Sequence, residues 1–164
     1  MSSPPHETSF DLDQYIKVAP WFLIASTTAT SYIDRFLVYF NLLTNHRVYL
    51  DKQKDGTIIT YLHVRYFGYH VAITFKGVVV ANEMTNMVKG KPYKSQIIET
   101  DNKTYSIAYN KHGAAIYCNK STMDPRVLEG LLKHPLLIGK KIYRINHKRA
   151  MSHELVSRPI VIEW

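Results

Sequence analysis

The stretch from Ile97 to His134 reads IIETDNKTYSIAYNKHGAAIYCNKSTMDPRVLEGLLKH. Its first part divides into three short segments rich in β-branched and aromatic residues, which is typical of strands. The turn signals DN at 101–102 and KHG at 111–113 separate these segments. In the last part, Asp124 is suited to an N-cap and Pro125 to the first helical position, which predicts a helix over about 124–134. The stretch therefore predicts consecutive antiparallel strands followed by one helix.

Strand patterns also fill the region before this stretch. From Arg47 to Met84 the chain is rich in Val, Ile, Thr, Tyr and Phe, and Asp55-Gly56, Gly68 and Gly77 interrupt it as predicted turns or bulges. Together these patterns indicate about eight or nine strands with short connections. Closing such a sheet removes its unpaired edges. We therefore expect an all-β fold, an eight-stranded up-and-down antiparallel β-barrel with one C-terminal α-helix packed outside.

Length and composition favour one domain. The chain has 164 residues, 46% hydrophobic and 21% charged, without a break in composition. We expect a flexible polar tail at 1–9, a barrel domain at 10–148 and a C-terminal extension at 149–164 that packs on the barrel. Cys118 is the single cysteine of the sequence, so a disulfide within the chain is excluded.

Alternation along the strands identifies the side chains expected inside the barrel. The pattern starts on the strand before the Asp55-Gly56 hairpin and is carried across each later turn. Glu99 shares a face with Ile97, so its carboxylate is also expected inside. The predicted ligand wall consists of Val48, Leu50, Ile58, Thr60, Leu62, Val71, Ile73, Ile97, Ser106, Ala108 and Ile116.

The sequence carries no recognisable catalytic motif. It has no nucleophile elbow, no phosphate-binding Gly-rich loop and no Cys/His pattern with metal-ligand spacing. The closest histidine pairs, His63 with His70 and His147 with His153, lack the spacing that puts two ligands on one face of a strand or helix. We therefore predict a binding protein without enzymatic activity, metal or cofactor, although the sequence leaves a haem ligand open.

Three segments of the chain resemble the lipocalin family, whose members are calyx barrels with a helix outside. The segment FDLDQYIKVAPWF is similar to the family's entry into the first strand, with Trp21 at the tryptophan position and Ala19 where a glycine is usual. Thr100-Asp101-Asn102 resembles the family's Thr-Asp-Tyr turn, and Lys120 stands where an arginine is usual. The resemblance implies that Trp21, Thr100, Asp101 and Lys120 are structural residues, with the Lys120 cation placed over the Trp21 ring.

The resemblance also implies a function. Family members bind and transport a small hydrophobic or amphipathic ligand, such as a fatty acid, a retinoid or an odorant-like compound, inside the barrel. By position, Phe36, Tyr39 and Phe40 would line the mouth of the barrel. Secretion is implied as well, but the polar start of the sequence contains no apolar leader, so a cytosolic protein stays open.

Other interpretations remain open. A fatty-acid-binding barrel would carry its helices after the first strand rather than after the last ones. A basic barrel could bind nucleic acid, because the net charge is +8 and one strand face is predicted to present Tyr61, His63, Arg65, Phe67 and Tyr69. The Lys and Arg residues are nevertheless scattered, so nucleic acid is not favoured. A strand near 142–146, placed after the helix, would leave an edge through which a homodimer could form.

Overall fold

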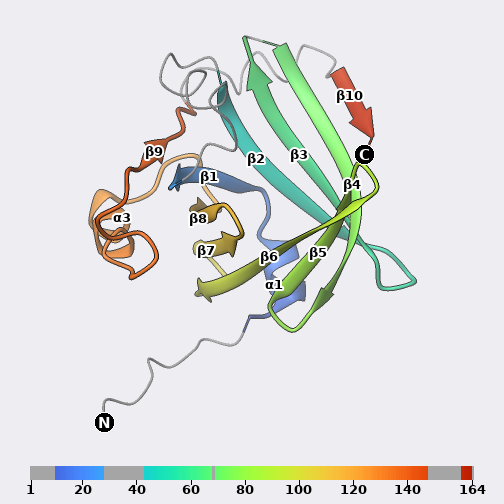
Figure 1. Cartoon of the computed structure of the whole chain (residues 1–164), viewed down its shortest axis with the longest axis horizontal. Coiled ribbons are helices and arrows are strands. Elements are labelled where there is room, and N and C mark those ends of the chain that lie inside the picture. The colour runs from blue at the N-terminus through green and yellow to red at the C-terminus, as the bar shows by residue number, and fades with distance from the viewer. Residues whose placement is uncertain (1–9, 28–42, 68, 148–159, 164) are drawn as a thin grey trace.

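Eight strands close into one barrel in the computed structural model, which describes residues 10–27, 43–67, 69–147 and 160–163 (Figure 1). Consecutive strands are antiparallel, and the pairing of β1 with β8 completes the ring. The strands are β1 (Trp21–Ser26), β2 (Leu43–Lys52), β3 (Ile58–Tyr66), β4 (Tyr69–Val80), β5 (Glu83–Val88), β6 (Lys91–Thr100), β7 (Tyr105–Asn110) and β8 (Gly113–Cys118). The prediction of an all-β up-and-down barrel is confirmed.

The predicted interruptions have different outcomes. At the β2–β3 turn, Asp55 Oδ1 accepts a hydrogen bond from the Thr57 N–H over 3.0 Å, and Gly56 has a φ of 86° that favours glycine. Gly77 is neither a turn nor a bulge, because it lies inside β4 and pairs with Ile58 and Asn86. Gly68 lies outside the described residues. The turn that follows β4 lies instead at Ala81 and Asn82, between Val80 and Glu83.

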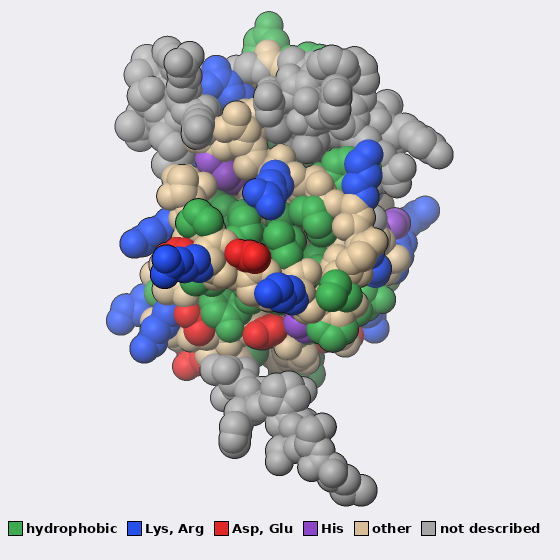
Figure 2. Space-filling model, turned by 90° about the vertical axis from the view of Figure 1, so that its left-hand side faces the viewer, with side chains coloured by type: hydrophobic (Ala, Val, Ile, Leu, Met, Phe, Trp, Pro, Cys, Tyr) green, Lys and Arg blue, Asp and Glu red, His purple; other side chains and the backbone are tan. Residues whose placement is uncertain are grey.

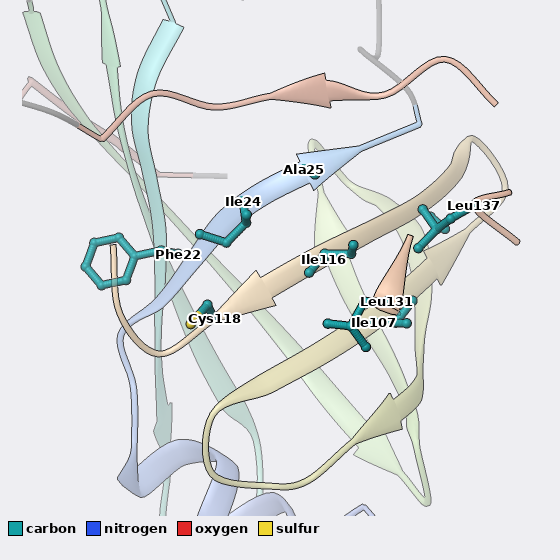
Figure 3. Close-up of a cluster of buried hydrophobic side chains, with 9 residues drawn as sticks. Phe22, Ile24, Ala25, Ile107, Ile116, Cys118, Leu131 and Leu137 are labelled. Carbon is teal, nitrogen blue, oxygen red and sulfur yellow. The ribbon is translucent and has the colours of Figure 1, made fainter. Parts of the chain in front are cut away.

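The helix α3 (Pro125–Leu131) follows β8 and packs on the outside of the barrel (Figure 1). Asp124 caps it, since its Oδ1 accepts from the Arg126 N–H over 2.8 Å. Leu131 and Leu137 pack against Ile107 and Ile116 of the barrel wall (Figure 3). A helix behind the last barrel strands agrees with the sequence prediction. Among the described residues, no helix has the length and apolar character needed to cross a membrane.

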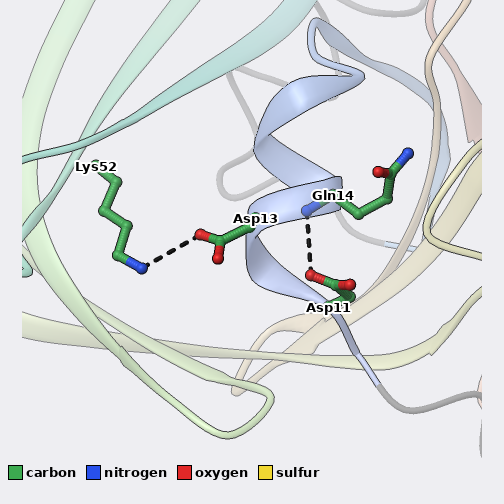
Figure 4. A network of polar contacts seen from close by, with 4 residues as sticks. All are labelled: Asp11, Asp13, Gln14 and Lys52. Atoms are coloured by element: carbon green, nitrogen blue, oxygen red, sulfur yellow. Dashed lines mark hydrogen bonds and ion pairs between the residues drawn. The ribbon is translucent and has the colours of Figure 1, made fainter.

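A short helix, α1 (Leu12–Lys17), covers one end of the barrel. Its N-cap is Asp11, whose Oδ1 accepts from the Gln14 N–H over 3.1 Å, and Lys52 of β2 contacts Asp13 over 3.2 Å (Figure 4). Both partners of that ion pair are largely exposed, so it contributes little to stability. Apolar side chains of α1 also pack against Trp21, Leu50 and Ile58 on the barrel floor.

The Thr100-Asp101-Asn102 turn ties the same end together. Asp101 Oδ1 accepts the backbone N–H groups of Lys103, Thr104 and Tyr105 at 2.8–3.1 Å. Partial burial opposes ionisation of Asp101, but these hydrogen bonds, together with that of the Thr104 hydroxyl, lower its pKa. Asn102 Oδ1 accepts the Asp11 N–H over 2.9 Å. This turn thus fixes α1 to the β6–β7 connection.

Two C-terminal segments complete the wall near the other end. β9 (Tyr143–Arg144) pairs with β1, and the Asn45 N–H of β2 donates to the Asn146 carbonyl over 3.0 Å. β10 (Ile160–Glu163) runs parallel to β4. The segment near 142–146 is therefore bonded to β1 along one of its edges, and the predicted homodimer stays a prediction. The predicted tail at 1–9 and most of the predicted extension lie outside the described residues.

Candidate ligand-binding site

Cross-strand pairing defines the face of the sheet that points into the barrel. Trp21 pairs with Val48, Val48 with Leu62, and Leu62 with Ile73. Trp21 also packs in one cluster with side chains of β2 to β6 and of β8. Because contacts between strands on opposite sides of a barrel occur only through its centre, this face is the inward one.

Two apolar clusters occupy the interior. The cluster at the closed end is built on Tyr15, Trp21, Leu50 and Ile58. The second is built on Val64, Val71 and Ile73, and Ile145 and Ile162 of the C-terminal segments pack against it. On β3, Thr60 lies between Ile58 of the first cluster and Leu62 at the second. The interior is therefore apolar at both levels, with a hydroxyl between them.

Most of the predicted wall residues lie on the inward face. On β2 to β4 the observed register is the predicted one, with Leu50 opposite Thr60 and Leu62 opposite Ile73. On β6 and β7, Ile97 pairs with Ala108, and Ser106 lies two residues away on the same face. The inward set contains Val48, Leu50, Ile58, Thr60, Leu62, Val71, Ile73, Ile97, Ser106 and Ala108. Phe36, Tyr39 and Phe40, predicted at the mouth, lie outside the described residues.

Two inward assignments are wrong. Ile116 pairs with Ile107, and both are fully buried in the outer cluster beneath α3 (Figure 3). Glu99 also points outward, because a register shift between Ile97 and Glu99 changes the face, and its carboxylate lies 3.7 Å from the His134 ring. The barrel interior therefore loses one predicted apolar side chain and its predicted carboxylate.

The inward wall contains buried polar atoms that have no hydrogen-bond partner among the described residues. Thr60 is 3% exposed and Asn86 is 6% exposed, and neither Thr60 Oγ1 nor Asn86 Oδ1 has a hydrogen-bond partner among the described residues. The Asn86 side chain lies over Gly77, since a Cβ added there would be 2.2 Å from Asn86 Oδ1. Sequence reasoning found Thr60 but missed Asn86, because an asparagine in a strand has no pattern that separates inside from outside.

His46 is a third polar group on this side of the wall. Two residues before Val48, its ring centroid lies 6.3 Å from that of the inward-facing Tyr117. Burial lowers the pKa of His46 to about 3, and His147 acts in the same direction, so the imidazole is neutral at physiological pH. Its Nδ1 has no partner among the described residues. Sequence reasoning missed this residue too.

The tyrosines of the interior are also neutral. Burial raises the pKa of Tyr117 to about 12, and the nearby Tyr93 adds to the effect. At the closed end, the Tyr15 hydroxyl is 3.0 Å from Ser106 Oγ, and burial raises the pKa of Tyr15 well above its ordinary value. These hydroxyls can therefore donate hydrogen bonds but supply no charge.

The strand face proposed for nucleic acid is divided in the structure. Tyr61, His63 and Arg65 share the outward face of β3, but the strand ends at Tyr66, and Phe67 and Tyr69 lie at the following hairpin. Lys and Arg side chains on the α3 side of the molecule are separated by acidic and hydrophobic ones (Figure 2). The stripe predicted on a single strand face is therefore limited to Tyr61, His63 and Arg65 on β3.

The β3–β4 hairpin brings His63 and His70 together. Cross-strand pairing places Arg65 opposite His70, and His63 Nδ1 lies 2.8 Å from His70 Nε2. The spacing of seven residues did not predict this contact, because the two side chains lie on different strands and meet across the hairpin. No group of three or more potential metal ligands occurs in the described ranges. The prediction that no metal is bound remains a prediction.

Comparisons with known proteins agree with the geometry of the barrel. No protein-family model matches the sequence, and a search of curated proteins gives no match. Among solved structures, the chain is similar to the siderocalin Ex-FABP, with 11% identity and a TM-score of 0.60 over 82% of this chain and 97% of that one. It is likewise similar to the major allergen Per a 4 from cockroaches, with 12% identity and a TM-score of 0.60 over 89% and 94% of the two chains. The chain has the lipocalin fold.

Within the lipocalin fold, the structural residues expected from the resemblance have separate roles. The Trp21 ring is 1% exposed and stacks on Tyr15 at 4.1 Å between centroids, while its Nε1 donates to the Tyr15 carbonyl over 2.8 Å. Lys120 is exposed and borders a shallow depression of about 240 Å³ beside Cys118 and Met123. Among the described residues, no cation–π contact joins Lys120 to Trp21, and the aromatic neighbour of Trp21 comes from α1.

Proposed function

We propose that this chain binds a small hydrophobic or amphipathic molecule inside the barrel and carries it without chemical change. The observation that supports the proposal is the inward wall, which is aliphatic on β2 to β4. It also contains the Thr60 hydroxyl, which has no hydrogen-bond partner among the described residues. Apolar surface contributes about 25 cal/mol for each Å² removed from water, so such a wall favours apolar ligands. A fatty acid, a retinoid and an odorant-like compound all belong to this class.

Carriage and secretion extend the same proposal. A ligand enclosed by apolar side chains is separated from water, which is what transport of a poorly soluble molecule requires. The similar siderocalin Ex-FABP functions through dual ligand specificities, so one barrel of this shape is a ligand-binding protein. For this chain, we propose a secreted carrier with an unidentified ligand.

The test is binding of an environment-sensitive fluorescent probe to the wild type and to a Leu62→Trp variant. Leu62 faces inward, so the larger indole should fill the binding space and weaken probe binding at least tenfold. Tyr61→Trp is the matched control, because Tyr61 is the next residue and faces outward. Both variants should first show the circular dichroism of a folded barrel.

Comparison of the two variants distinguishes binding inside the barrel from binding elsewhere on the protein. Loss of probe binding in Leu62→Trp with wild-type binding in Tyr61→Trp would support an interior site. Equal binding in the wild type and both variants would place the probe elsewhere and contradict the proposal. The absence of any probe binding to the wild type would also contradict it.

A further inference from the structure

We infer that the ligand is uncharged and carries a hydroxyl, carbonyl or amide group that forms a hydrogen bond with the Thr60 hydroxyl and that can form others with Asn86 and His46. This inference rests on the proposed function, because it concerns the occupant of the same interior. It goes further by choosing between ionised and neutral amphipathic molecules. The sequence left this choice open, because the positive net charge favours carboxylates whereas the Glu99 expected inside the barrel would oppose them.

The first support is a set of polar atoms that face inward without partners. Thr60 lies on β3, Asn86 on β5 and His46 on β2, so the three surround the interior from different strands. Neither Thr60 Oγ1, Asn86 Oδ1 nor His46 Nδ1 has a partner among the residues that the structure describes. Thr60 and Asn86 are also more than nine-tenths buried. Native proteins satisfy nearly all such groups, so a ligand group that pairs with them is favoured.

The chemistry of these atoms matches a neutral polar group. A threonine hydroxyl can donate and accept, an amide oxygen accepts, and a neutral imidazole nitrogen does one or the other according to its tautomer. A ligand hydroxyl could donate to Asn86 Oδ1, and a ligand carbonyl could accept from the Thr60 hydroxyl. Both pairings are complete without a charge on either partner.

The second support is the charge of the wall. In the described strands, the side chains that pair onto the inward face are uncharged, apart from Lys52 and Lys91 at the ends of β2 and β6. Glu99 points outward to His134, and Arg47 lies opposite the outward-facing His63. A carboxylate that reached the level of Thr60 would therefore lose its hydration without meeting a cation on this wall.

The competing possibility is that a carboxylate is bound at the level of Thr60. This would require a positive charge there, but burial of His46 disfavours the imidazolium that could provide one. Lys52 does not replace it, because it is exposed at the closed end and contacts Asp13. The described wall thus discriminates against an ionised head group at this level.

Displacement of the fluorescent probe by decanol and by decanoate at pH 8 tests the inference. The two ligands share their chain length, so the difference reports the head group. Decanol should compete at a concentration at least about tenfold lower than decanoate, because only the carboxylate loses ionic hydration. Decanoate that competes as well as decanol, or better, would overturn the inference.

Two threonine variants test the proposed contact. Thr60→Val removes the hydroxyl and keeps the shape, so it should weaken decanol binding about fivefold and should weaken binding of the apolar probe, which has no head group to pair with the hydroxyl, by a smaller factor. Thr85→Val is the matched control, because Thr85 pairs with Lys94 on the outward face. An unchanged decanol affinity in Thr60→Val would show that the head group does not bind the Thr60 hydroxyl, and would contradict the inference. Failure of the wild type to bind the probe would instead contradict the proposed function.

Discussion

Tyr15 links the first helix to the barrel floor through three different contacts. Its ring stacks on Trp21, its carbonyl accepts the Trp21 indole N–H, and its hydroxyl pairs with Ser106 Oγ over 3.0 Å. Tyr15 itself is 5% exposed, and Ser106 is fully buried. A hydrogen bond in this environment matters mainly because either partner left alone would be buried and unsatisfied.

We expect Tyr15→Phe to lower the free energy of unfolding by about 1–2 kcal/mol. The substitution keeps the ring stack but leaves the buried Ser106 hydroxyl without its hydrogen-bond partner. Adding Ser106→Ala removes the stranded group, so the double variant should lose less than the sum of the two single variants. Urea unfolding of the four proteins measures this coupling. Additive losses would show that the two hydroxyls do not interact.

At the scale of the strand, position 77 requires glycine because atoms of the paired strand β5 leave no room for a side chain. A Cβ at this position would lie 2.2 Å from Asn86 Oδ1 and 2.4 Å from the Thr85 carbonyl oxygen. The second atom belongs to the backbone of the paired strand β5, so it cannot move without disturbing the ladder. The absent side chain at Gly77 thus allows β4 and β5 to pair beneath the Asn86 side chain.

Gly77→Ala should lower the free energy of unfolding by about 1–3 kcal/mol, because it overpacks the β4–β5 contact. Gly130→Ala is the matched control, since a Cβ at Gly130 of α3 meets nothing within 4 Å. This second substitution should raise stability by about 0.5–1 kcal/mol through helix propensity. Thermal and urea unfolding compare the pair, and equal effects of the two alanines would contradict the packing argument.

The sequence specifies the strands better than their register. Alternation and turn residues are local signals, so the inward face of β2 to β4 follows correctly from the Asp55-Gly56 hairpin. On β6, the register shift between Ile97 and Glu99 falls within the run IIET, where every residue suits a strand and none marks a bulge. The face of Glu99 therefore could not be read from the sequence.

The error at Ile116 has a similar origin. The KHG segment predicts a loop of all three residues, but Gly113 belongs to β8 and pairs with Asn110, which leaves Lys111 and His112 as the turn. Ser106 consequently pairs with Tyr117, and Ile116 falls on the outer face. A change of one residue in a turn reverses the face of a whole strand. Among the polar groups of the interior, His46 and Asn86 were missed because burial of a polar residue depends on distant strands.

For the whole molecule, the last described strand extends the barrel wall beside β4. β4 pairs with β5 only from Gly77 to Val80, and β10 covers the edge of β4 from Val71 to Thr74. Ile162 of β10 pairs with Ile73 and packs on the inner cluster, whereas its neighbour Val161 is 62% exposed. β10 therefore both satisfies the β4 backbone and adds an apolar side chain to the interior.

Removal of residues 160–164 should lower the melting temperature and increase self-association, because it leaves four residues of β4 as an unpaired edge. Sedimentation velocity at several concentrations, compared with the full chain, measures the second effect. Ile162→Ala isolates the interior contact and should cost about 1–2 kcal/mol, below the range for a fully buried isoleucine. Val161→Ala, on the exposed face, should leave stability nearly unchanged. If the truncated chain kept the melting temperature and sedimentation of the full chain, β10 would be an accessory of the barrel and not part of its wall.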